Sequence, residues 1–195
     1  MSTQKRTYEL KARAEAQEAT RARITAAAAS LHEEVGIAKT TVADIARRAG
    51  VQRLTVYNHF SDLGALLPAC SAHWLSENPM PDLEPALALA DPEERLRAAL
   101  TSLYGWYGEH APMQRRVHGE RATVPELDAW MGRSSDPMLA GLADTLAAGF
   151  GRAHARALVA LALDFWIWQR LDREGLDASE AAGLMAGVVG GDSAS

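Results

Sequence analysis

The chain has 195 residues, of which 48% are hydrophobic and 23% are charged, and this composition is ordinary for a soluble globular protein of one or two domains. The single cysteine excludes an intrachain disulfide and suits a reducing compartment. No stretch has the pattern of a signal peptide or the length of a membrane-spanning helix. We therefore expect a cytoplasmic protein with no membrane partner.

Charge is distributed unevenly along the chain. Residues 1–67 contain 10 Lys and Arg against 7 Asp and Glu, whereas the remainder contains 10 Arg against 18 acidic residues, and the net charge is −5. A basic segment on an acidic body indicates that the first part meets a polyanion and the second does not. Chance scatter of surface charge is the alternative, and the motifs have to decide between the two.

The pattern of apolar residues predicts an all-α protein of about nine helices. Ala, Leu, Arg and Glu dominate, and alternating runs of Val, Ile and Thr do not occur. The first helix is expected over residues 10–35 and ends at Gly36. Its apolar stripe consists of Ile24, Ala27, Ala28, Leu31 and Val35.

Two short helices joined by a turn are predicted next. The first opens at Thr41, and Asp44 follows three residues later in the manner of a capping box. Gly50 supplies a tight turn, and the second short helix then buries Val56 and Phe60, which are four residues apart. Two short helices with a glycine-containing turn, braced by a longer helix, predict a helix-turn-helix.

Three side chains of the second short helix suit the reading of bases. In a helix-turn-helix this helix lies in the major groove of DNA, with its inner face packed on the first short helix. Arg can bind guanine, Asn can bind adenine, and Leu can contact the methyl group of thymine. We therefore predict base contacts for Arg53, Leu54 and Asn58.

Other side chains of the motif suit phosphates. Thr, Tyr and His can donate to phosphate oxygens, which predicts backbone contacts for Thr55, Tyr57 and His59. At Thr40 and Thr41, free N–H groups at the start of a helix can receive a phosphate. The alternative is a helical hairpin whose outer face is merely polar.

The stretch TTVADIARRAGVQRLTVYNHF, residues 40–60, resembles the DNA-binding domain of TetR-family transcriptional regulators. RITAAAASLHEEVG, residues 23–36, resembles the first helix of that domain, and GALLPAC, residues 64–70, resembles the fourth. The resemblance implies the same division between base-reading and phosphate-binding residues, with Thr55 at the edge of the groove. It covers about a quarter of the chain.

The chain departs from the family pattern at three positions. Leu54 stands where Gly is frequent, Leu63 stands where a phosphate-binding Lys is usual, and Gln52 replaces a Ser or Thr cap. A phosphate contact is therefore expected to be missing at Leu63. Affinity for the DNA backbone is then expected to depend more on Lys39 and on the N-terminal arm with Lys5, Arg6 and Lys11.

The rest of the chain predicts further helices. They are expected over residues 62–77 and about 92–109, from near Pro112, Pro125 and Pro137, over about 152–174, and over about 177–189, with a frayed tail at 190–195. We place the domain boundary between residues 61 and 62. Residues 1–61 form the N-terminal arm and the helix-turn-helix domain, and residues 62–195 form an effector-binding and dimerisation domain.

Aromatic and Met residues gather in the second part of the chain and suggest a small-molecule pocket. The alternative is that these rings are simply core. In TetR-like proteins the middle helices usually enclose an effector site, so the resemblance favours a pocket for a largely apolar molecule, with an arginine that could anchor a polar group. The expected lining is Trp106, Tyr107, Met113, Arg115, Arg116, Trp130 and Trp166.

The expected helix at 152–174 is apolar nearly all round through ALVALALDFWIW, which predicts burial on two sides. One side, including Val159 and Leu163, is expected to meet a second subunit together with the small residues of AAGLMAGVVGG. In TetR-like proteins these two helices pair across a twofold axis. A homodimer is therefore expected.

No catalytic constellation, metal-ligand motif or cofactor-binding loop is found. Cys70 and His73 are three residues apart, but nothing suggests a third group to orient them. The sequence therefore favours a one-component repressor that binds a palindromic operator in double-stranded DNA and is released by an effector. An orphan regulator or activator without a working pocket is one alternative. An enzyme or ligand carrier with an incidental helix-turn-helix is the other.

Overall fold

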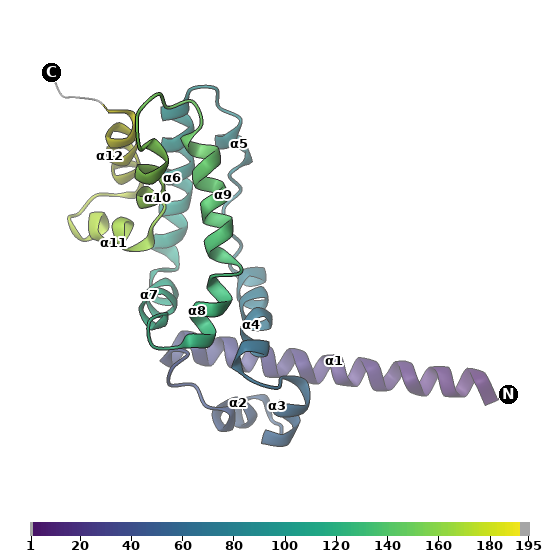
Figure 1. Cartoon of the computed structure of the whole chain (residues 1–195). Helices are drawn as coiled ribbons and strands as arrows, with labels where there is room; N and C mark the ends of the chain where they lie inside the picture. Colours follow the sequence, from purple (N-terminus) through teal and green to yellow (C-terminus); the bar gives the residue numbers. More distant parts are fainter. Residues whose placement is uncertain (1, 192–195) are drawn as a thin grey trace. The chain divides into compact units, whose positions relative to one another are not determined.

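A computed structural model describes the backbone of residues 2–191 and the side chains from Thr7 onward, and all regular structure within that range is helical (Figure 1). The all-α prediction is confirmed, but this part of the chain forms twelve helices instead of about nine. The side chains of Lys5 and Arg6 and the tail at 192–195 lie outside the described residues.

The chain divides into two compact units. The first runs from the N-terminus to Asn78 and also takes in Gly119–Trp130, while the second consists of Pro79–His118 and the residues from Met131 onward. The division at Asn78 differs from the expected boundary at residues 61 and 62. Helix α4 therefore lies in the same unit as the first three helices.

The first unit is built around the long helix α1. Its helices are α1 (Ser2–Val35), α2 (Val42–Ala49), α3 (Arg53–His59), α4 (Leu63–Glu77) and, apart from its last residue, α8 (Pro125–Met131). Helices α2 and α4 pack on α1, and α3 packs on α2. Figure 1 shows α1 projecting past α3 towards the N-terminus, and its side chains from residue 7 to 19 are all exposed.

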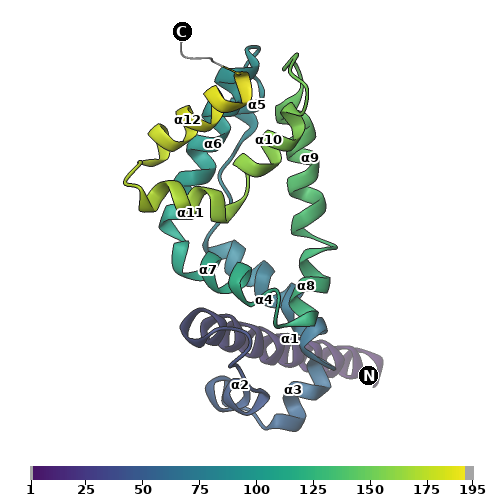
Figure 2. The same ribbon diagram turned by 60° about the vertical axis from the view of Figure 1, so that its left-hand side comes forward.

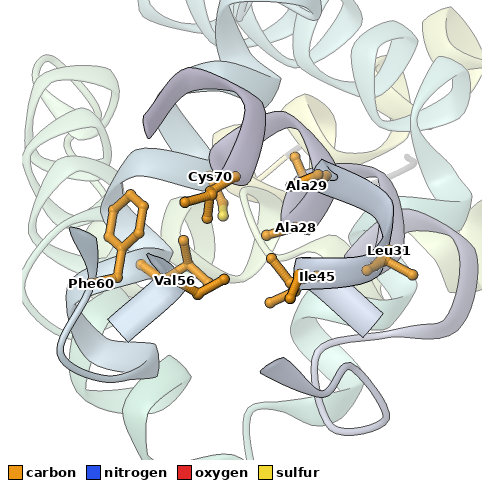
Figure 3. Close-up of a cluster of buried hydrophobic side chains, with 12 residues drawn as sticks. Ala28, Ala29, Leu31, Ile45, Val56, Phe60 and Cys70 are labelled. Atoms are coloured by element: carbon orange, nitrogen blue, oxygen red, sulfur yellow. The ribbon is translucent and has the colours of Figure 1, made fainter. Parts of the chain in front are cut away.

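The core of the first unit joins α1 to the helix-turn-helix (Figure 3). Figure 3 shows apolar side chains of α1, α2, α3 and α4 gathered between these helices, among them Ala28, Ile45, Val56 and Cys70. Of the expected stripe on α1, the first four residues are buried, but Val35 is 41% exposed. Val35 is the last residue of α1, where the chain turns away into the loop at Gly36.

The second unit is organised around helix α6. Its helices are α5 (Glu84–Leu87), α6 (Pro92–Glu109), α7 (Ala111–Glu120) up to His118, α9 (Ser135–Ala147), α10 (Ala155–Ala162), α11 (Phe165–Arg173) and α12 (Ala178–Gly190). Helices α5, α9, α11 and α12 all pack on α6, and Figure 2 shows α12 lying along it. The last two residues of α7, Gly119 and Glu120, belong to the first unit.

The helix expected over residues 152–174 is in fact two helices, α10 and α11. Asp164 separates them because its carboxylate accepts from the N–H groups of Trp166 (2.8 Å) and Ile167 (3.2 Å), as an N-cap does. The hydroxyls of Tyr104 and Tyr107 donate to the carbonyls of Ala162 (2.7 Å) and Leu163 (2.9 Å) at the end of α10. The break is therefore stabilised from both sides.

Candidate nucleic-acid interface

The start of α2 is fixed by its cap. The N–H of Asp44 donates to the Thr41 hydroxyl (3.2 Å), and that hydroxyl donates to the Asp44 carboxylate (2.5 Å). These bonds, together with an ion pair between the Arg47 guanidinium and the Asp44 carboxylate at 2.7 Å, hold the pKa of Asp44 below its ordinary value. The cap that the sequence predicts at Thr41 is confirmed.

The turn between α2 and α3 depends on Gly50. Its φ of 66° lies in the left-handed region, which residues other than glycine rarely adopt. The following N–H, that of Val51, donates to the Ala46 carbonyl at 3.0 Å. This is the pattern that ends a helix and reverses the chain, and it sets the direction in which α3 leaves α2.

Helix α3 divides its side chains between the core and solvent. Val56 is 2% exposed and Phe60, which follows the helix, is 3% exposed, whereas Leu54 is 67% and Tyr57 52% exposed. Arg53 and Asn58 are exposed and Thr55 and His59 half-buried. The inward and outward faces expected from the sequence are therefore those of the structure.

Arg21 of α1 fastens the end of α3, which sequence reasoning did not anticipate. Its guanidinium donates to the His59 carbonyl at 3.0 Å and lies over the ring of Phe60, 4.1 Å from the centroid. A cation over an aromatic face is attracted by the ring quadrupole. The two residues are 38 positions apart in sequence, so no local pattern predicts the contact.

The entry to α2 differs from expectation in one respect. Lys39 and Thr41 are exposed, as a phosphate contact requires. Thr40, however, donates its N–H to the Ile37 carbonyl at 3.1 Å and its hydroxyl to the Gly36 carbonyl at 2.7 Å. Its N–H is therefore not one of the free groups expected there.

A second clamp joins α2 to α1. The Arg48 guanidinium donates twice to the Glu34 carboxylate, with one of the two bonds at 2.7 Å, and once to the Ser30 hydroxyl at 2.7 Å. The Arg48 hydrogen bond is the main reason why the pKa of Glu34 lies below its ordinary value. The pairing holds Arg48 against α1, so it contributes to the position of α2.

Known proteins share both this domain and the whole fold. The sequence model of the tetR family of bacterial regulatory proteins matches residues 24–70. Residues 24–70 therefore match the DNA-binding domain of this family. A TetR-family regulator, PfmR from Thermus thermophilus, has a similar solved structure at 25% identity, a TM-score of 0.57, and coverage of 86% of this chain and 96% of that one.

A transcriptional regulator from Rhodococcus sp. Rha1 has the same fold, with 22% identity, a TM-score of 0.61, and coverage of 87% of this chain and 95% of that one. A TetR-like regulator from Rhodococcus sp. RHA1 matches at 20% identity and a TM-score of 0.58, over 86% of this chain and 91% of that one. No curated protein matches in sequence. The chain is a DNA-binding transcriptional regulator.

The residues expected around an effector differ widely in their solvent exposure. Trp106 (8% exposed), Tyr107 (4%) and Met113 (7%) are buried, whereas Trp166 is 43% exposed. Arg115 is exposed, and Arg116 is half-buried. Trp130 is half-buried and is assigned to the first unit, whereas the other six belong to the second.

The second unit does bring aromatic rings together, in a wider set than expected. Tyr107 lies 5.9 Å from Trp106, 5.4 Å from Phe165 and 5.6 Å from Trp168, measured between ring centroids. His118 stacks on Phe165 at 5.1 Å. We call these rings, with His110 and Trp166, the ring cluster. Phe165, Trp168, His110 and His118 were not among the expected lining residues.

Other candidate chemistry has a structural explanation. Cys70 is buried, its thiol donates to the Thr25 carbonyl at 3.8 Å, and burial raises its pKa to about 12, which disfavours a nucleophilic thiolate. Among the described residues, no group of three or more His, Cys, Asp and Glu could hold a metal ion. Within the same part of the chain, no helix has the length and apolarity needed to cross a membrane.

Proposed function

We propose that this regulator is a homodimeric repressor that binds a palindromic operator and leaves it when an effector binds the second unit. The observation that carries the proposal is the outward face of α3. Arg53, Leu54 and Asn58 are exposed on a helix whose opposite side is fixed to α1 and α2 through Val56 and Arg21. A rigid helix with such a face suits the major groove.

Base reading and phosphate binding are separable by mutation. We expect Arg53→Ala and Asn58→Ala to cost about 1–3 kcal/mol against the preferred duplex and to relax specificity. Tyr57→Phe and His59→Ala should weaken binding to every duplex about equally, because phosphates carry no base information. Competition between a duplex selected by the wild type and a scrambled one measures both. Full retention of the preference by Arg53→Ala would refute the assignment.

The dimer proposal rests on α10 and α12. Leu161, Leu184 and Val188 are 52%, 48% and 44% exposed, and small residues surround the last two on α12. Val159 and Leu163, expected to face a partner, are instead buried within the subunit at 0% and 2% exposure. The exposed leucines are therefore the residues to test. Two copies would place their α3 helices about one turn of DNA or more apart.

Effector release is proposed from the ring cluster. Trp166, exposed beside Phe165 and His118, could receive an apolar molecule, and Arg116 is half-buried on the helix that carries His118. A ligand releases DNA only if it binds a DNA-incompetent arrangement more tightly than the competent one. A tenfold release needs about 1.4 kcal/mol of such preference.

Screening apolar metabolites by tryptophan fluorescence, followed by DNA binding with each hit, tests the effector. One observation favours the orphan alternative, in which the cluster is only core: the hydroxyl of Tyr107, at the centre of the cluster, donates to the Leu163 carbonyl at 2.9 Å. Compounds that quench fluorescence and leave operator affinity unchanged would support that alternative. Compounds that quench it and weaken binding would support effector release.

A further inference from the structure

Glu120 reaches from the end of α7 to the loop that leads into α2. Its carboxylate accepts from the N–H of Ile37 at 2.6 Å and from the N–H of Ala38 at 3.1 Å, across 83 and 82 residues of sequence. Hydrogen bonds to an ionised acceptor are among the stronger ones in proteins. One side chain therefore holds two successive N–H groups of the loop directly before Lys39, Thr40 and Thr41.

The backbone of Glu120 is itself fixed. Its carbonyl accepts from the N–H groups of Thr123 and Val124, both at 2.9 Å, which closes the end of α7. Arg121 then pairs with Asp128 at 2.6 Å across the turn into α8, and Val124 is buried. The carboxylate is thus presented from an ordered corner and not from a loose surface helix.

Gly36 shows how closely the loop and the carboxylate approach. A Cβ atom at this position would lie 2.0 Å from Oε1 and 2.9 Å from Cδ of Glu120. The φ of Gly36, +93°, is also in the left-handed region, which residues other than glycine rarely adopt. The loop therefore needs glycine for two reasons, and one of them is the presence of Glu120.

We propose that Glu120 is a positioning residue for DNA binding, which acts by fixing the loop that presents Lys39 and Thr41 to the phosphates. This inference rests on the proposed contacts of those residues with DNA.

The sign of the effect separates positioning from bulk charge. A carboxylate close to a DNA-binding surface repels the polyanion, so its removal alone should raise affinity for DNA. Loss of a positioning contact should lower it. Glu126, exposed in the first turn of α8 in the same segment, provides a matched control because Glu126→Gln removes the same charge without touching the loop.

The test compares Glu120→Ala, Glu120→Gln and Glu126→Gln on a duplex that the wild type selects from a random library. We expect about a tenfold loss of affinity for Glu120→Ala, a smaller loss for Glu120→Gln, which keeps one acceptor oxygen, and unchanged or slightly tighter binding for Glu126→Gln. Wild-type affinity in both Glu120 variants would overturn the proposal. Should Glu120→Ala fold poorly, Glu120→Gln at unchanged melting temperature decides.

Two further readouts address the loop directly. Amide exchange at Ile37 and Ala38 should accelerate in Glu120→Ala, and Lys39→Ala should cost less affinity in that background than in the wild type, because both changes affect one contact. Additive losses would overturn the positioning role. If the wild type selects no duplex, the proposed DNA contacts are refuted. Unchanged amide exchange at Ile37 and Ala38 in Glu120→Ala would instead refute the proposal that Glu120 fixes the loop.

Discussion

The two units expose apolar side chains in different settings. On α3 of the first unit, Leu54 and Tyr57 stand among Arg53, Thr55 and Asn58. On α12 of the second unit, Leu184 and Val188 stand among Ala and Gly. Apolar groups between hydrogen-bonding groups suit base edges and sugars, whereas apolar groups between small residues suit another protein surface. The setting, more than the exposure, distinguishes the two proposed partners.

The largest expected effect concerns the exposed apolar residues of α12. Leu184→Glu should convert a dimer to a monomer and weaken operator binding about 100-fold or more, because a single subunit loses the gain from simultaneous engagement of two half-sites. Met138→Glu, at a position on α9 that is 52% exposed, is the control and should remain dimeric. Light scattering and DNA binding measure both. A wild type that is monomeric at micromolar concentration would disprove the dimer.

The ring cluster is tested by two tryptophans that differ in burial. Trp168 is 4% and Trp166 43% exposed. Trp168→Ala should therefore lower the free energy of unfolding by about 3–5 kcal/mol, whereas Trp166→Ala should change it by less than about 1 kcal/mol. Denaturant unfolding gives both values. If a compound found by tryptophan fluorescence no longer binds Trp166→Ala, and the variant is as stable as the wild type, the ligand lies at the exposed edge of the ring cluster. A large destabilisation by Trp166→Ala would show that Trp166 belongs to the core.

The helix-turn-helix could be predicted because its signals are local. The cap at Thr41, the left-handed turn at Gly50 and the buried pair of Val56 and Phe60 all depend on residues within a few positions of one another. The outward face of α3 then follows from helical periodicity alone. Leu54 and Gln52 are two of the three departures from the family pattern, and α3 forms with both of them in place.

The other features escaped prediction because they depend on distant residues or on competing local signals. Nothing around Glu120 or Arg21 in sequence indicates a backbone partner 83 or 38 residues away. At Asp164 the signal was local but ambiguous, since one aspartate in an apolar run can interrupt a helix or cap a new one. The carbonyl bonds from Tyr104 and Tyr107, which favour the break, come from another helix.

The first unit also contains a buried histidine, which predicts sensitivity to acid. His32 is 4% exposed, its Nε2 has no hydrogen-bond partner, and burial lowers its pKa from 6.5 to about 4. As pH falls through 6.5 the unfolded chain binds a proton that the folded chain does not. Unfolding should therefore become easier between pH 6.5 and 4, by up to about 3 kcal/mol.

His32→Leu removes this proton linkage. Unfolding of the variant should show a shallower loss of stability than the wild type over that pH range. At pH 8 the histidine is neutral in both states, so the comparison there reports packing alone. Equal slopes for the two proteins between pH 6.5 and 4 would show that other groups dominate acid unfolding.

The smallest effect concerns Thr41, where a folding role coincides with a predicted DNA-binding role. Its hydroxyl caps α2 through Asp44, and the residue is exposed at the predicted phosphate site. Thr41→Ala should cost about 1 kcal/mol of stability through loss of the cap. Thr41→Ser keeps the hydroxyl and should restore both stability and DNA affinity. If the alanine variant loses stability and keeps wild-type DNA affinity, the hydroxyl serves only the fold, and the first phosphate contact must come from the N–H groups of α2 or from Lys39.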